Sequence, residues 1–243
     1  MELNVNKQFI ISNLNASFYA RFSHEMRTTL TGVVGFSEYI EHSVNGPMMK
    51  FASKAINQSG KDVLRLTSAY FDLFRLQSGE INFQFSKFNV AEVVNEVMLQ
   101  ARESAALRSV RVILSCDDAV WAVRAESDLG FFKRLIDLLL QDFIWTSKKE
   151  DLIQIELRQD GLEEYFQLRF YRSLREPDVG WIALNQNFWS DCEFLHEKQE
   201  GPGVGAVLAK NLIYGLQGRI ACIVVDDKTF ALDTFFPVNI GRI

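Results

Sequence analysis

The residues best placed to do chemistry in this sequence are His24 and its neighbour Glu25. Around them, largely apolar residues recur in alternating steps of four and three, the spacing of a helix with one buried face. The members of this row are Phe22, Met26, Thr29, Val33, Phe36 and Ile40. Because His24 follows Phe22 by two residues, or about 200° around the helix axis, its imidazole is expected to point into solvent.

An exposed imidazole beside a carboxylate can accept a phosphoryl group. The carboxylate takes up the ring proton, and the other ring nitrogen is then free to attack. A second interpretation is a surface histidine without a chemical role, which is common for histidines outside any motif. The residues around His24 favour the first interpretation.

The segment FSHEMRTTLTGVVGFSEYI, residues 22–40, resembles the histidine box of sensor histidine kinases. LRLTSAYFDLFRLQSGE, residues 64–80, resembles the end of that family's second dimerisation helix. The resemblance implies that His24 is the phospho-acceptor and Glu25 the general base of its phosphorylation. It also implies that Thr28 helps to orient water when a receiver domain is dephosphorylated.

Two long helices are needed to position His24. A turn signal at 45–47 separates the first from a second amphipathic run over 56–74, which Ser78-Gly79 ends. A hairpin cannot bury both apolar stripes alone, so we expect a homodimer with a four-helix bundle. Thr29 replaces the proline usual in the family, which predicts a straighter, stiffer first helix because the backbone donor is kept.

After residue 80 the pattern changes to grouped strands and helices. This order is typical of an α+β sandwich with helices on one face of a mixed sheet. We therefore expect a dimerisation and histidine phosphotransfer hairpin over 1–80 and an ATPase-like α+β domain over 81–243. Strands are predicted at 81–88, 110–116, 120–125, 152–158, 165–172, 219–225 and 230–237, and helices after the caps Asn89 and Ser127 and after Gly201 to Gly205.

The order of elements in this second part resembles the family's ATP-binding domain. GPGVGAVLAKNLIYGLQGRI, residues 201–220, resembles its second glycine box. Gly201, Gly203 and Gly205 would let backbone amides at a helix start face a phosphate. A structural tight turn explains the same glycines equally well.

The rest of the predicted nucleotide site departs from the family pattern. DLLLQDFIWTS, residues 137–147, aligns with the asparagine box, where Asp137 and Gln141 replace asparagines and Ile144 replaces a lysine. The first glycine box should follow the strand at 165–172, yet only Asp178 and Gly180 share its spacing, and both lie late. These changes argue against binding of ATP and magnesium.

Composition excludes several other classes. The formal net charge of −5 and the absence of a Lys/Arg run argue against nucleic-acid binding. No apolar stretch is long enough for membrane insertion. Three separated cysteines, at 116, 192 and 222, fit neither a metal site nor a disulfide framework, and indicate a reducing, cytoplasmic compartment.

Three functions fit these residues. The first is a phosphorelay histidine phosphotransferase that takes a phosphoryl group from one receiver aspartate and passes it to another, without a cofactor. The second is a divergent, ATP-dependent sensor histidine kinase, and the third is a non-enzymatic scaffold for a response regulator. The expected partners are a second copy, receiver domains and an upstream, hybrid histidine kinase. Receivers are expected to contact Arg21, Arg27 and Thr31 beside His24.

Overall fold

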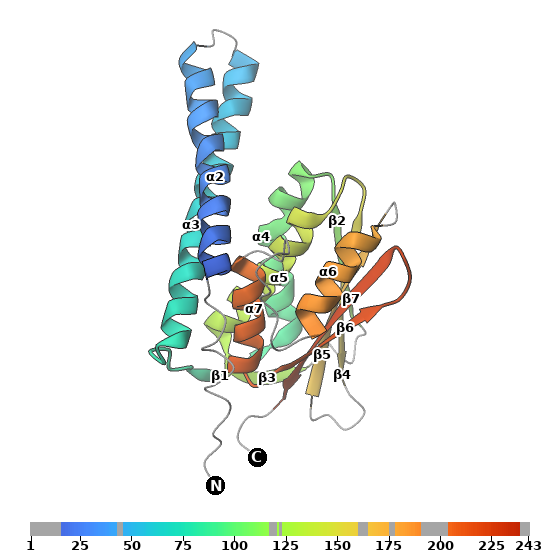
Figure 1. Cartoon of the computed structure of the whole chain (residues 1–243). Coiled ribbons are helices and arrows are strands. Elements are labelled where there is room, and N and C mark those ends of the chain that lie inside the picture. Colours follow the sequence, from blue (N-terminus) through green and yellow to red (C-terminus); the bar gives the residue numbers. More distant parts are fainter. Residues whose placement is uncertain are drawn as a thin grey trace. The chain divides into compact units, whose positions relative to one another are not determined.

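The computed structural model describes residues 16–42, 46–116, 121, 123–159, 165–174, 178–190 and 204–238. The described residues up to Glu80 form one compact unit, and those from Ile81 onward form a second. We call the first the helical hairpin and the second the α/β unit (Figure 1).

The helical hairpin consists of α2 (Ala16–His42) and α3 (Gly46–Gln77). Pro47 lies in the first turn of α3, where its missing N–H has no helical partner to lose. On α2, every member of the row from Phe22 to Ile40 is half-buried. The predicted row is therefore the face by which α2 packs against α3.

The two helices run antiparallel and pack closely. Phe22 stacks on Tyr70 with 4.5 Å between ring centroids, and Phe36 meets Phe51 edge-on at 5.9 Å. Between these pairs, a Cβ added to Gly32 would lie 3.1 Å from a serine hydroxyl of α3. The absence of a side chain at Gly32 thus allows the backbones to approach.

The α/β unit contains four helices and seven strands in its described part. In chain order these are β1 (Phe85–Asn89), α4 (Val90–Leu107), β2 (Arg111–Cys116), β3 (Arg124–Asp128), α5 (Leu129–Thr146), β4 (Leu152–Gln159), β5 (Tyr165–Ser173), α6 (Val179–Ser190), α7 (Val204–Gly215), β6 (Arg219–Val224) and β7 (Thr229–Pro237).

Five strands form a mixed sheet in the order β2-β4-β5-β7-β6, where only the β2–β4 pair is parallel. The helices lie on one face of this sheet (Figure 1). Ile155, Phe170 and Leu232 occupy one cross-strand row on that face and are fully buried. Their strand neighbours Glu156 and Arg169 are only half-buried. The predicted α+β sandwich with helices on one face is confirmed.

Two details of the predicted elements are wrong, for one physical reason. Asp128, and not Ser127, caps α5: its carboxylate accepts from the N–H of Phe131 at 3.0 Å. The same carboxylate accepts from the N–H of Gln84 at 2.7 Å. This long-range contact accompanies a separate β1–β3 pair, in which Ser127 lies within β3. The predicted strands at 81–88 and 120–125 accordingly become Phe85–Asn89 and Arg124–Asp128.

Helix α6 was not predicted from the sequence, in which this segment was compared with the family's first glycine box. Its buried residues, Ile182, Asn185, Phe188 and Trp189, have helical spacing. Lys210 of α7 donates to the Phe188 carbonyl at 2.5 Å and so connects α7 to the C-terminal end of α6. The signal was present in the spacing and could have been found.

Substituting Gly218 with alanine should destabilise the α/β unit. A Cβ there would lie 2.6 Å from Cε1 of Phe236 and 2.9 Å from the backbone oxygen of Phe235, so the β6–β7 hairpin would have to shift. Overpacking of this kind costs about 1–3 kcal/mol, measured as a lower urea midpoint. Gly205→Ala is the matched control, since its Cβ would make an ordinary 3.5 Å contact with Leu138. Equal midpoints for both variants would contradict the prediction.

Candidate functional site

His24 lies on α2 and is exposed, as the spacing predicts. Phe22 and Met26, two residues to either side, are half-buried against α3, so the imidazole turns outward from the hairpin. Glu25 follows directly and is half-buried. Burial of the neighbouring apolar residues thus fixes which side of α2 presents the histidine.

Three further polar residues share the face of α2 that carries His24. Arg27, Thr28 and Thr31 follow at three, four and seven residues, and all are exposed. Residues at these separations lie next to one another along a helix. The side chain of Arg21, the remaining predicted docking residue, lies outside the described residues.

Helix α2 runs unbroken past Thr29, where the resemblance leads one to expect proline. The hydroxyl of Thr29 donates to the carbonyl oxygen of Glu25 at 2.8 Å. The side chain therefore binds one turn back along the helix. A proline at this position would instead remove a backbone donor and clash with the preceding turn.

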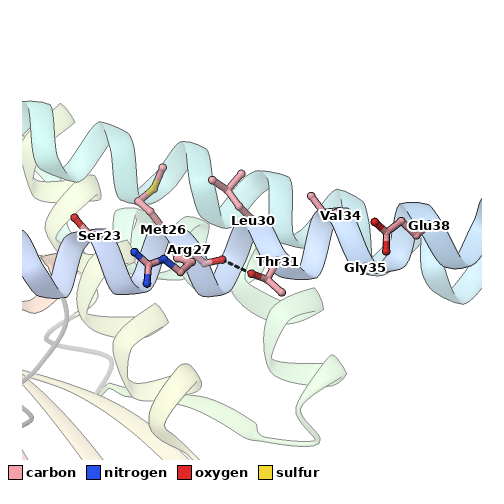
Figure 2. Close-up of a pocket in the computed structure, with 8 residues that line it drawn as sticks. All are labelled: Ser23, Met26, Arg27, Leu30, Thr31, Val34, Gly35 and Glu38. Carbon is pink, nitrogen blue, oxygen red and sulfur yellow. Dashed lines mark hydrogen bonds between the residues drawn. The ribbon is translucent and has the colours of Figure 1, made fainter.

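A shallow depression runs along α2, and its lining begins at Ser23, the residue before His24 in the sequence (Figure 2). Leu30 and Val34 give it an apolar floor and are 46% and 53% exposed. Arg27 and Thr31 belong both to the depression and to the His24 face, and the Thr31 hydroxyl donates to the Arg27 carbonyl at 2.8 Å. The other lining residues are Ser23, Met26, Gly35 and Glu38.

Asp137 and Gln141 lie one turn apart on α5. The amide Nε2 of Gln141 is 3.4 Å from Oδ1 of Asp137, and Arg134 Nη1 is 3.9 Å from Oδ2 of Asp137. The carboxylate is thus held by a guanidinium and an amide from its own helix. Gly205 lies at the start of α7 against Leu138 of α5, while Gly201 and Gly203 lie outside the described residues.

A buried ion pair lies where β5 ends. Arg172 and Asp151 have side chains 1% exposed, and Nη2 of Arg172 is 3.2 Å from Oδ2 of Asp151. Arg172 also donates to the carbonyl oxygen of Thr146 and to its hydroxyl, the latter at 3.0 Å. Burial lowers the pKa of Arg172, and the hydrogen bond to Asp151 opposes that effect. The guanidinium therefore joins β5 to the last turn of α5 and the start of β4.

Asp178, the acidic residue of the predicted first glycine box, also makes an ion pair. Its Oδ2 is 3.2 Å from Nζ of Lys148, at a more exposed position than the Arg172 pair.

Arg172 was not predicted from the sequence to be a residue of interest. An arginine at an otherwise apolar, inward-facing strand position, after Phe166, Leu168 and Phe170, was the available signal.

No helix in the described part of the chain combines the length and the apolar character needed to cross a bilayer.

Two curated relatives match most of this chain. The sensor protein GacS of Pseudomonas syringae pv. syringae is 23% identical over 215 residues, which cover 86% of this chain and 23% of that protein. The circadian input-output histidine kinase CikA of Synechococcus elongatus is 24% identical over 222 residues, covering 88% of this chain and 29% of that protein. The chain thus spans about a quarter of the length of these relatives. No family model matches the chain.

Solved structures show the same fold. The Acinetobacter baumannii histidine kinase AdeS has a TM-score of 0.60 at 14% identity, covering 88% of this chain and 98% of that one. Histidine kinase ThkA, solved in complex with response regulator TrrA, has a TM-score of 0.61 at 18% identity, covering 92% of this chain and 61% of that one. The chain is therefore related to the sensor histidine kinases, with the two N-terminal helices and the ATP-binding-like α+β domain of that family.

Proposed function

We propose that this chain is a two-component signalling protein that carries a phosphoryl group on His24 and exchanges it with aspartates of receiver domains. The observation that carries the proposal is the exposed imidazole, followed by Glu25, on an unbroken helix of a kinase-like hairpin. The ThkA structure, which contains a response regulator, supports receivers as the partner class.

The chemistry requires only groups on α2 and on the receiver. A ring nitrogen of His24 attacks the phosphorus of a receiver aspartyl phosphate, forming a P–N bond as the P–O bond to the aspartate breaks. The aspartate leaves as a carboxylate, and Glu25 takes the proton from the imidazole. Passing the group to a second receiver is the same step in reverse.

Within this proposal the chain needs neither ATP nor magnesium. This is supported by Arg172 at the end of β5, which is paired with Asp151 and offers only hydrogen-bond donors, so it cannot accept from the amino group of adenine. Asp178 is paired with Lys148. Asp137, the acidic residue of the altered asparagine box, is held by Arg134 and Gln141.

The receiver is proposed to dock on the His24 face of α2. Arg27 and Thr31 are exposed and share the face of α2 that carries His24. An arginine cation near the histidine would favour an acidic receiver site electrostatically.

Thr31→Arg should therefore slow transfer from a receiver by about 10-fold or more, since a bulky cation would obstruct this face. Ser37→Arg is the matched control. Ser37 is also exposed on α2, and its hydroxyl also donates to a backbone carbonyl, that of Val34, at 2.8 Å. Single-turnover transfer rates distinguish the two. Equal rates for Thr31→Arg and wild type would place the docking surface elsewhere.

A second copy of the chain is proposed to complete a four-helix bundle. On α3, Leu64, Phe71 and Phe74 are 69%, 58% and 54% exposed, and on α2 the floor of the depression is apolar. Exposed apolar rows on both helices of one hairpin are what a dimeric bundle buries.

Leu64→Glu should halve the mass of the assembly in sedimentation equilibrium, because a carboxylate would have to be desolvated in the bundle core. The exposed substitution Lys61→Glu, one turn earlier on α3, is the control that changes charge alone. If both variants keep the wild-type mass, the bundle does not assemble through this face.

An ATP-dependent kinase is the second candidate. It is favoured by the fold, since the related structure of ShkA, with a TM-score of 0.58 at 13% identity, was solved in complex with AMPPNP. Incubating the chain with labelled ATP and magnesium, with and without a phosphorylated receiver, separates the candidates. Label on His24 only from the receiver supports phosphotransfer, label from ATP supports the kinase, and no label leaves a scaffold.

A further inference from the structure

Strand β6 forms one edge of the five-stranded sheet. It pairs with β7 on one side, and in the described part of the chain no strand pairs with it on the other. An edge strand presents a row of backbone donors and acceptors that can template another strand. Most natural edges carry a charge, a proline or a bulge that discourages such pairing.

The side chains of β6 do not protect this edge. From Ile220 to Val225 the sequence IACIVV has no charge and no proline. Ile223, Val224 and Val225 are 37%, 36% and 57% exposed. Beyond its first residue, Arg219, the strand is therefore short, uncharged and rich in β-branched residues, and its exposed positions favour contact with another strand.

The direction of its backbone groups follows from the register with β7. The N–H of Val225 donates to the carbonyl of Thr229 at 3.0 Å. Backbone groups alternate in direction along a strand, so Ile223, Ala221 and Arg219 also direct their N–H and C=O groups toward β7. Ile220, Cys222 and Val224 therefore direct their N–H and C=O groups away from β7. The outward set is symmetric about Cys222.

We propose that β6 is a second self-association site, at which β6 of another copy pairs antiparallel about Cys222. A two-fold axis there places Ile220 opposite Val224 of the second copy, so the three outward residues of both strands form hydrogen-bonded pairs. Arg219 begins the strand and Asp226 follows its end, both exposed. Antiparallel pairing brings these opposite charges near each other, whereas a parallel arrangement would align like charges.

This interface is separate from the bundle proposed for the helical hairpin. A chain with two different two-fold contacts assembles beyond a dimer, into a closed tetramer or an open array. Its presence or absence can therefore be measured whether or not the hairpin dimerises.

The mass of the intact chain tests the proposal. Ile223→Lys should halve the mass in sedimentation equilibrium by placing a charge on this edge. Ile113→Lys, on the opposite edge strand β2, is the matched control, because Ile113 is 44% exposed and should leave the mass unchanged. An unchanged mass for Ile223→Lys overturns the proposal, as does an equal loss for both variants.

Disulfide cross-linking tests whether the two β6 strands pair antiparallel about Cys222. Hydrogen-bonded antiparallel residues have Cα atoms about 5.5 Å apart, within the range of a disulfide. Copper-catalysed oxidation should therefore yield a covalent dimer that Cys222→Ser abolishes and Cys116→Ser retains. The opposite result would contradict the edge-strand pairing: if Leu64→Glu loses the covalent dimer and Cys222→Ser retains it, the chain associates through the hairpin alone.

Discussion

Replacing His24 with glutamine is expected to abolish phosphoryl exchange with a receiver, by about three orders of magnitude or more, to the level of spontaneous receiver hydrolysis. Glutamine keeps similar length and polarity on an exposed helical face, so the fold is retained. Its amide nitrogen is not a nucleophile, and loss of the attacking group removes most of the catalytic effect of a transfer site.

The measurement is single-turnover transfer from a receiver carrying a labelled aspartyl phosphate. His42→Gln is the matched control, because His42 is also exposed and lies at the end of the same helix. Circular dichroism of both variants confirms that α2 is intact. If His24→Gln retains transfer while His42→Gln loses it, the acceptor has been misassigned. If each variant retains transfer, His24 is not the required acceptor, and the remaining histidine at position 196 is the next residue to replace.

The exposed position of His24 could be predicted from the sequence because it depends on local information, a helical row over residues 22–40. Its role as phospho-acceptor, which was inferred from the neighbouring carboxylate and the continuous motif, stays a prediction. Local periodicity fixes which side of a helix is buried, and the structure has His24 exposed between half-buried Phe22 and Met26. Asn89 was identified in the same way, and its side chain accepts from the N–H of Glu92 at 3.1 Å.

Features that depend on distant parts of the chain were not accessible in this way. Ser127 and Asp128 are equally good caps by residue type, and the contact from Gln84 accompanies a strand pair that no local pattern encodes. The exposed edge of β6 likewise becomes visible only when the strand order is known. The Arg172–Asp151 pair joins residues 21 positions apart in the sequence.

That buried pair should be among the largest stability determinants of the α/β unit. Asp151→Asn retains a side-chain oxygen that can accept from the N–H of Lys148, a bond of 2.9 Å in the structure. It leaves the guanidinium of Arg172 without its carboxylate in a site where both side chains are 1% exposed. An uncompensated buried charge costs about 3–5 kcal/mol, measured as a fall in the urea midpoint of the intact chain.

The exposed pair of Lys148 and Asp178 provides the control. Its side chains are 59% and 31% exposed, so Asp178→Asn should cost less than about 1 kcal/mol. A double variant, Asp151→Leu with Arg172→Met, should recover much of the loss, because well-packed apolar residues often replace a buried ion pair without penalty. If Asp151→Asn were as mild as Asp178→Asn, Arg172 would have to reach water when its partner is removed. The end of β5 would then be open enough to admit a ligand, and the ATP-dependent candidate would gain support over phosphotransfer alone.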